Sequence, residues 1–142
     1  MTGGTSGFGA IAAERLMRSG SVRLISGARR PISAGESLQL DLGELDSVRA
    51  FAARIGEGPG VTAVDALVLN AGIVRPTLNT RTAAGTALAD LALGRVTPPK
   101  GHTYAALRRG RLRWVQPSQL ARRDDLAQAL WSDSARLVGL PD

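Results

Sequence analysis

Residues 2–9 of this chain read T-G-G-T-S-G-F-G, a glycine-rich stretch that leads directly into a helical pattern of apolar residues. The phosphates of a nucleotide need backbone N–H donors at close range and the positive end of a helix behind them, and glycine lets the main chain approach that closely. Phe8, Ile11, Ala12 and Leu16 recur at helical spacing after the loop. The stretch therefore predicts a nucleotide-phosphate loop, with an ordinary glycine-rich turn as the alternative.

Three stretches with the composition of β-strands follow the loop. Residues 22–26, V-R-L-I-S, have the pattern of a buried strand, and residues 38–42, L-Q-L-D-L, alternate apolar with polar side chains. Residues 66–69, A-L-V-L, predict a third strand, which ends in Asn70, Ala71 and Gly72.

Helices are predicted between and after these strands. Asp46 or Ser47 can cap a helix that Gly56 should end. Residues 83–93 form a short helical stretch, and apolar residues around Trp131 mark a C-terminal helix whose stripe is expected to pack. Because strands and helices alternate, the sequence favours the α/β class with a parallel sheet and crossover helices.

In order and in detail these segments resemble the short-chain dehydrogenase/reductases, Rossmann-fold enzymes that move hydride to or from a nicotinamide. Residues 2–9 resemble that family's cofactor loop, and Asp41 and Leu42 its adenine-contacting pair. Residues 69–72, L-N-A-G, resemble its N-N-A-G sequence with the first Asn replaced, and residues 101–140 resemble the tail of the retinol-dehydrogenase-like branch. The resemblance implies an incomplete Rossmann-like three-layer fold.

Twelve residues are assigned to cofactor binding on this basis. They are Gly3, Thr5, Ser6, Gly7, Phe8, Gly9, Arg29, Asp41, Leu42, Asn70, Ala71 and Gly72. Arg29 lies just past the strand at 22–26, about 20 residues after the loop. An acidic residue at this place would bind the ribose of NAD, whereas an arginine accommodates the 2′-phosphate of NADP. The expected cofactor is therefore NADP.

The catalytic residues of the family are not found. The family uses a Ser, a Tyr and a Lys, with Tyr-x-x-x-Lys on one helix, because the ammonium lowers the pKa of the catalytic phenol. The one tyrosine here is Tyr104, and the one lysine, Lys100, precedes it. Arg108 follows Tyr104 by four residues, but a bulky planar guanidinium does not freely replace an ammonium. The resemblance implies NADP-dependent oxidoreduction of carbonyl or alcohol substrates, yet no catalytic residue can be assigned.

The expected organisation is a partial cofactor-binding half at residues 1–82, a junction at 83–100 and a tail segment of the same domain at 101–142. The family's first strand would precede Thr2, and its Ser-Tyr-Lys segment would lie between residues 85 and 101. The sequence therefore indicates a truncated and internally deleted member, whose neighbouring strands would pair directly or leave a gap. The alternatives are a non-catalytic nucleotide-binding or interaction remnant and a gene fragment without function.

Composition limits the remaining function classes. A chain of 142 residues with 44% hydrophobic and 21% charged residues suits one globular domain. The absence of cysteine excludes disulfides, and a single histidine cannot build a metal cluster. No apolar run reaches the length of a membrane span and no leader pattern is seen, so a cytoplasmic location is expected. Substrate and oligomeric state are left open.

The net charge of +6 lies wholly in the second half of the chain. Residues 1–71 hold 7 basic and 7 acidic side chains, whereas residues 72–142 hold 11 and 5. Four arginines gather within residues 108–113. Because no recognised nucleic-acid module accompanies them, the sequence alone favours a solvated face, and nucleic acid is not an expected partner.

Overall fold

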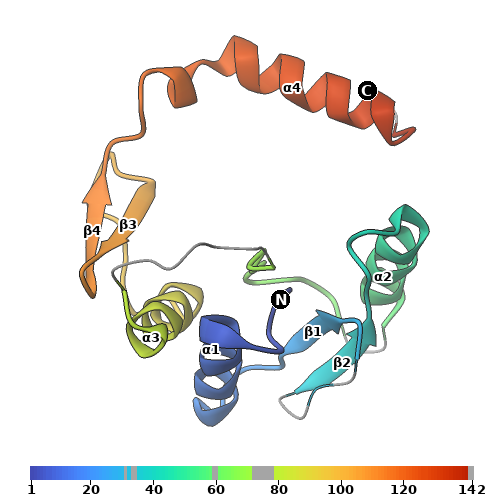
Figure 1. The fold of residues 1–142 in the computed structure, drawn as a ribbon, viewed down its shortest axis with the longest axis horizontal. Helices are drawn as coiled ribbons and strands as arrows, with labels where there is room; N and C mark the ends of the chain where they lie inside the picture. The colour runs from blue at the N-terminus through green and yellow to red at the C-terminus, as the bar shows by residue number, and fades with distance from the viewer. Residues whose placement is uncertain (31, 33–34, 59–60, 72–78, 141–142) are drawn as a thin grey trace. The chain divides into compact units, whose positions relative to one another are not determined.

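The computed structural model describes residues 1–30, 32, 35–58, 61–71 and 79–140. This part of the chain is mixed α/β, as the sequence predicts, and it ends in the expected C-terminal helix (Figure 1). In chain order the elements are α1 (Gly7–Arg18), β1 (Ile25–Ala28), β2 (Glu36–Gln39), α2 (Leu45–Glu57), α3 (Arg81–Ala92), β3 (Tyr104–Arg108), β4 (Arg111–Val115), the 3₁₀ turn η1 (Leu120–Arg122) and α4 (Asp124–Leu137).

The chain divides into two compact units. One consists of residues 1–97 with 107–113, and the other of residues 98–106 with 114–142. The first unit holds α1, α2, α3, β1 and β2, and the second holds α4. The turn end of the β3–β4 hairpin belongs to the first unit and its open end to the second.

The first unit contains a parallel two-stranded sheet formed by β1 and β2. Ile25 pairs with Glu36, and the N–H of Leu40 donates to β1 at 2.9 Å, which extends the pairing one residue past β2. β1 lies later than the strand predicted at residues 22–26, and β2 lies earlier than the one predicted at 38–42. The register gives the reason for both shifts. Residues 25–28 are paired with residues 36–39 across the ladder, and only these paired residues form strand.

Met1 and Thr2 lie beside β1, on the edge that β2 does not occupy. The N–H of Gly27 donates to Met1 O at 2.9 Å, and the amino group of Met1 donates to Ile25 O. On the other side, the N–H of Thr2 donates to Val68 O at 2.9 Å. Two residues therefore connect β1 to the stretch around residue 68, so the two segments neither pair directly nor leave a gap.

The strand predicted at residues 66–69 is wrong. This stretch forms no ladder among the described residues: its one backbone bond to a neighbouring segment is the one that Val68 O accepts from the N–H of Thr2. Leu67 and Leu69 are 69% and 76% exposed. A two-residue partner offers too few donors and acceptors to hold a strand, and no other described element covers these leucines.

The short helix predicted at residues 83–93 is confirmed as α3, which starts two residues earlier. Thr80 caps it, because its hydroxyl oxygen accepts a hydrogen bond from the N–H of Ala83 at 3.1 Å. A threonine side chain at this position satisfies one of the donors that the first turn of a helix leaves free.

α1 and α3 pack together around the core of the first unit. The buried residues of this core are Ala12, Ala13, Leu16, Leu24 and Ala89. Gly85 makes the close approach of the two helices possible: a Cβ atom there would lie 2.6 Å from Phe8 O and 2.7 Å from Ile11 Cβ. Small residues on both helices therefore set their separation.

The start of α2 differs from the prediction. The helix begins at Leu45, with Glu44 in the capping position and no side-chain bond to the first turn. Neither Asp46 nor Ser47 caps it. Ser47 has another role, because its hydroxyl oxygen accepts from the N–H of Asp41 at 2.9 Å and so ties the end of β2 to the helix.

α2 covers the face of the sheet on which Gly27 lies. A Cβ atom at Gly27 would come within 2.4 Å of the Leu40 side chain and 2.9 Å of the Phe51 ring, so both side chains pack directly against the backbone of Gly27. Figure 1 draws α1 and α2 on opposite sides of the β1–β2 sheet. The predicted stop at Gly56 is wrong by one residue, since the helix continues to Glu57.

The second unit has little core of its own. Ala135 is its one buried apolar residue among those described, and the predicted packing of the stripe on α4 is wrong: Leu130, Trp131 and Leu137 are 70%, 66% and 86% exposed. Among the described residues of this unit, no second apolar surface covers this stripe.

The β3–β4 hairpin was not predicted. Arg109 and Gly110 form its two-residue turn, with φ of 49° and 73°. Left-handed backbone at both turn residues matches the twist of a hairpin. The signal in the sequence is a single glycine between two stretches of alternating apolar and polar residues, which the density of arginines obscures.

We expect two glycine-to-alanine changes inside helices to act in opposite directions. Gly85→Ala should destabilise the protein by about 1–3 kcal/mol, because its methyl group would push α1 and α3 apart. Gly56→Ala, with nothing within 4 Å of its Cβ, should stabilise α2 by up to about 1 kcal/mol. Thermal unfolding followed by circular dichroism measures both. A Gly85→Ala protein as stable as the parent would contradict the close packing.

Candidate dinucleotide site

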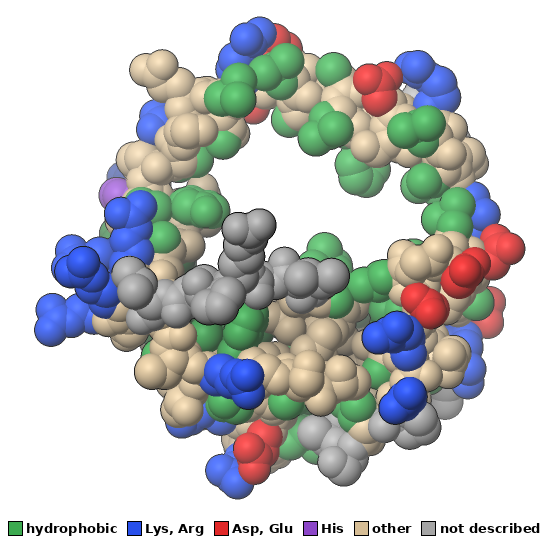
Figure 2. All heavy atoms as spheres, viewed as in Figure 1, with side chains coloured by type: hydrophobic (Ala, Val, Ile, Leu, Met, Phe, Trp, Pro, Cys, Tyr) green, Lys and Arg blue, Asp and Glu red, His purple; other side chains and the backbone are tan. Residues whose placement is uncertain are grey.

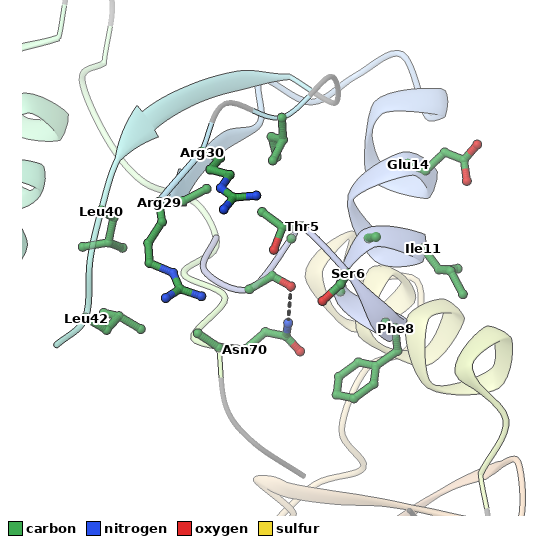
Figure 3. A pocket seen from close by; sticks show the side chains of 18 of the residues that line it. Thr5, Ser6, Phe8, Ile11, Glu14, Arg29, Arg30, Leu40, Leu42 and Asn70 are labelled. Carbon is green, nitrogen blue, oxygen red and sulfur yellow. Dashed lines mark hydrogen bonds between the residues drawn. The ribbon is translucent and has the colours of Figure 1, made fainter.

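A pocket of about 1380 Å³ opens beside the glycine-rich loop in the first unit (Figure 3). Its walls come from the loop and the start of α1, the ends of β1 and β2, and the stretch after residue 68. The residues that line it are Gly3, Gly4, Thr5, Ser6, Gly7, Phe8, Gly9, Ala10, Ile11, Glu14, Ala28, Arg29, Arg30, Ile32, Leu40, Asp41, Leu42, Asn70 and Ala71. This volume exceeds the roughly 300–1,000 Å³ of a typical small-molecule pocket, so it suits an extended ligand.

The structure brings eleven of the twelve predicted cofactor residues to this one pocket. The twelfth, Gly72, lies outside the described residues. Eight further lining residues were not assigned from the sequence: Gly4, Ala10, Ile11, Glu14, Ala28, Arg30, Ile32 and Leu40. Gly4, Ala10, Ile11 and Glu14 belong to the loop and helix that the motif identifies, so the motif could have indicated them. The other four lie near assigned residues at the ends of β1 and β2.

Glycine is required in the loop by both conformation and space. Gly3 has φ of 68° and Gly7 of 61°, which is the left-handed region that other residues rarely adopt. A Cβ atom at Gly9 would lie 2.1 Å from Gly3 O and 2.4 Å from the side-chain nitrogen of Asn70. Larger residues at Gly3 or Gly9 would push the loop away from Asn70, and the pocket would lose the wall that the loop forms.

The N-terminal end of α1 is available to an anion at the pocket wall. Ser6 precedes the helix, its side chain makes no capping bond, and the first turn contains no acidic residue. Thr5, Ser6 and Gly7 are exposed on the pocket side of this turn. The free N–H groups and the positive end of the helix dipole are therefore not neutralised by the protein, which is the arrangement that binds phosphate.

Thr2 connects the loop to the stretch after residue 68. It is buried, and its hydroxyl oxygen accepts from the N–H of Asn70 at 3.1 Å and of Ala71 at 3.0 Å. The side chain of Asn70 in turn donates to Gly3 O at 3.0 Å, the bond drawn in Figure 3. Thr2 was not among the predicted site residues, although it belongs to the motif. These bonds fix the loop against the Asn70 segment.

Two arginines directly follow β1 at the pocket. Arg29 and Arg30 are exposed, and in Figure 3 the side chain of Arg29 extends toward the space between Leu42 and the loop, while Arg30 reaches toward Thr5. Neither makes an ion pair with any residue that the structure describes. Both guanidinium groups are therefore open to an anionic ligand.

Just after the end of β2 lie Asp41 and Leu42. One carboxylate oxygen of Asp41 accepts from the N–H of Gly43 at 3.0 Å, which shapes the turn after the strand. Leu42 is 56% exposed and offers an apolar surface at the pocket rim. An apolar side chain beside a hydrogen-bonding carboxylate is a surface on which a flat heterocycle can lie.

Tyr104 does not lie in this pocket. It is on β3, and Arg108 at the other end of that strand is four residues away, or roughly 13 Å at the usual rise per residue. The two side chains therefore do not form the close pair that Tyr-x-x-x-Lys makes on a helix. Lys100 precedes the strand in a turn.

Comparison with protein-family models, curated proteins and solved structures finds no match for this chain. The described residues contain no group of three or more His, Cys, Asp or Glu side chains placed to hold a metal ion. Among them there is also no helix with the length and apolar character needed to cross a bilayer.

Replacement of Thr2 by valine should loosen the loop. The shape of the side chain is kept, but the N–H groups of Asn70 and Ala71 lose their acceptor, which should lower the free energy of unfolding by about 1–3 kcal/mol. Thr5→Val is the matched control, because Thr5 is exposed and should change stability by less than about 0.5 kcal/mol. Chemical denaturation of both variants tests this, and equal stabilities would refute the role of Thr2.

Proposed function

We propose that residues 1–97 form an incomplete Rossmann-like, three-layer fold of the short-chain dehydrogenase/reductase type and that the pocket binds NADP(H). The observation that carries the proposal is the convergence of a glycine loop, a helix N-terminus and two strand ends on one pocket. In a Rossmann fold the pyrophosphate lies at the first helix N-terminus and the ligand binds outside the carboxyl ends of the strands.

The order of the hydrogen-bonded segments supports the same fold. β2 pairs with β1, β1 with the Met1–Thr2 pair, and Thr2 with Val68. In a Rossmann-like fold this order would correspond to strands 3-2-1-4 of the doubly wound arrangement, with two residues in the place of the first strand and the stretch around Val68 in the place of the fourth.

The residues present fit the chemistry of a dinucleotide. The backbone of the loop and the free end of α1 would hold the pyrophosphate, while Asp41 and Leu42 would flank the adenine. Arg29 and Arg30 would face the 2′-phosphate, since both lack an ion-pair partner among the described residues and follow β1 at the place where the ribose is recognised. Two guanidinium groups without an ion-pair partner among the described residues favour NADP, which carries the 2′-phosphate, over NAD. The nicotinamide of the bound cofactor is a hydride carrier.

We further propose that this chain binds the cofactor without reducing carbonyl compounds. The family reaction needs a proton donor tuned by a neighbouring lysine, and Tyr104 and Lys100 are the chain's single representatives of these residues. Tyr104 lies on strand β3. In the family, the catalytic tyrosine lies on a helix, with the lysine four residues later. Oxidoreduction of carbonyl or alcohol substrates is therefore the second candidate, favoured by the resemblance alone.

NADPH should bind more tightly than NADH, by about tenfold or more, because a charge-assisted contact to the 2′-phosphate is worth about 1.5–3 kcal/mol. Arg29→Ala should remove most of this preference. Arg54→Ala, which deletes an exposed arginine of α2 away from the pocket, should keep it. Fluorescence titration of the two nucleotides measures the ratio. Equal affinities in the parent protein would refute the assignment of Arg29.

Mixed with NADPH and aliphatic or aromatic aldehydes and ketones, the purified chain should consume no NADPH above background. The physical reason is the lack of a lysine positioned to tune Tyr104. Absorbance of the reduced nicotinamide follows the reaction, with a Tyr104→Phe protein as the comparison. Turnover in the parent that Tyr104→Phe abolishes would show that this tyrosine is catalytic after all.

A further inference from the structure

The turn end of the β3–β4 hairpin presents a cluster of guanidinium groups, which we call the arginine tip. It consists of Arg108, Arg109, Arg111 and Arg113. A two-residue turn sets Arg108 opposite Arg111, and the alternation of side chains along β4 places Arg113 on the same face as Arg111. Arg109 occupies the turn itself. Three arginines therefore share one face of the ribbon, with the fourth at its end.

The opposite face of the tip is apolar and turned inward. Leu107 and Leu112, which alternate with the arginines, are half-buried, whereas the four arginines are exposed. Asn79 fastens the turn: its side-chain amide donates to Leu107 O at 2.9 Å, and its carbonyl oxygen accepts from the N–H of Gly110 at 2.8 Å. The ribbon is thus held at its back and displays its charge on a fixed scaffold.

The charge of the arginine tip is not balanced by its surroundings. None of its four arginines forms an ion pair with a described residue, whereas six other arginines do. Residues 91–123 contain eight Lys or Arg and no Asp or Glu. Figure 2 shows blue side chains gathered over the region where Figure 1 draws β3 and β4, with no red side chain among them on this face.

We propose that the arginine tip is a binding surface for the phosphate backbone of a nucleic acid. Arginine is the side chain best suited to phosphate, through paired N–H donors in a rigid plane. An anionic membrane would be the other polyanion, but a basic patch holds a protein stably at a membrane only together with a second signal, such as a lipid chain or an exposed apolar surface. The leucines of the tip face the protein, so the tip offers cations alone. This proposal is independent of cofactor binding.

The test is binding of a fluorescein-labelled oligo(dT) strand of about 20 nucleotides by fluorescence anisotropy, at several salt concentrations. Arg111→Gln/Arg113→Gln removes two charges from the tip. Arg15→Gln/Arg54→Gln removes two exposed charges from α1 and α2 and is the matched control, since these arginines also make no ion pair with a described residue. Circular dichroism establishes that both variants fold as the parent does.

The parent and the control should bind with equal affinity, and the tip variant should bind about tenfold more weakly or worse. The slope of log affinity against log salt should also fall by about 0.7 for each phosphate contact removed. Equal binding by the two double variants would overturn the proposal. So would binding of the parent to phosphatidylserine vesicles with none to the oligonucleotide, which would assign the tip to a membrane surface.

Discussion

The hydrogen bonds of Met1 and Thr2 are the interactions on which the first unit depends. Met1 O accepts from Gly27, and the N–H of Thr2 donates to Val68 O, so two residues connect β1 to the stretch after residue 68. The hydroxyl of Thr2 then holds Asn70. Without these bonds the β1–β2 sheet and the Asn70 segment would have no common backbone partner among the described residues, and the pocket between them would lose one wall.

The pocket follows from that arrangement and from the direction of the chain. β1 and β2 are parallel, so their carboxyl ends lie at the same edge, where Arg29 and Asp41 emerge. α1 begins at this edge as well, since the loop turns directly from Thr2 into the helix. Cations, a free helix end and a carboxylate are thereby gathered from residues distant in sequence, with glycines allowing the backbones to approach.

Much of this arrangement was predictable from the sequence, because the relevant signals are local. The glycine motif, the helix with Ile11 and Leu16, and the strand ends at Arg29 and Asp41 each lie within one short segment, and eleven predicted residues do line one pocket. Predictions failed where the outcome depends on distant partners. The stretch at 66–69 has strand composition but lacks a ladder, and the apolar stripe of α4 lacks a surface to cover it.

The central claim, that a dinucleotide binds at the glycine loop, is tested most directly by mapping the amide resonances of the ¹⁵N-labelled protein during titration with NADPH. Binding as proposed should shift the amides of residues 3–9, 29–30, 41–42 and 70–71, which line the pocket, and leave those of α4 in place. Shifts confined to other parts of the chain, or no shifts at saturating nucleotide, would contradict the account.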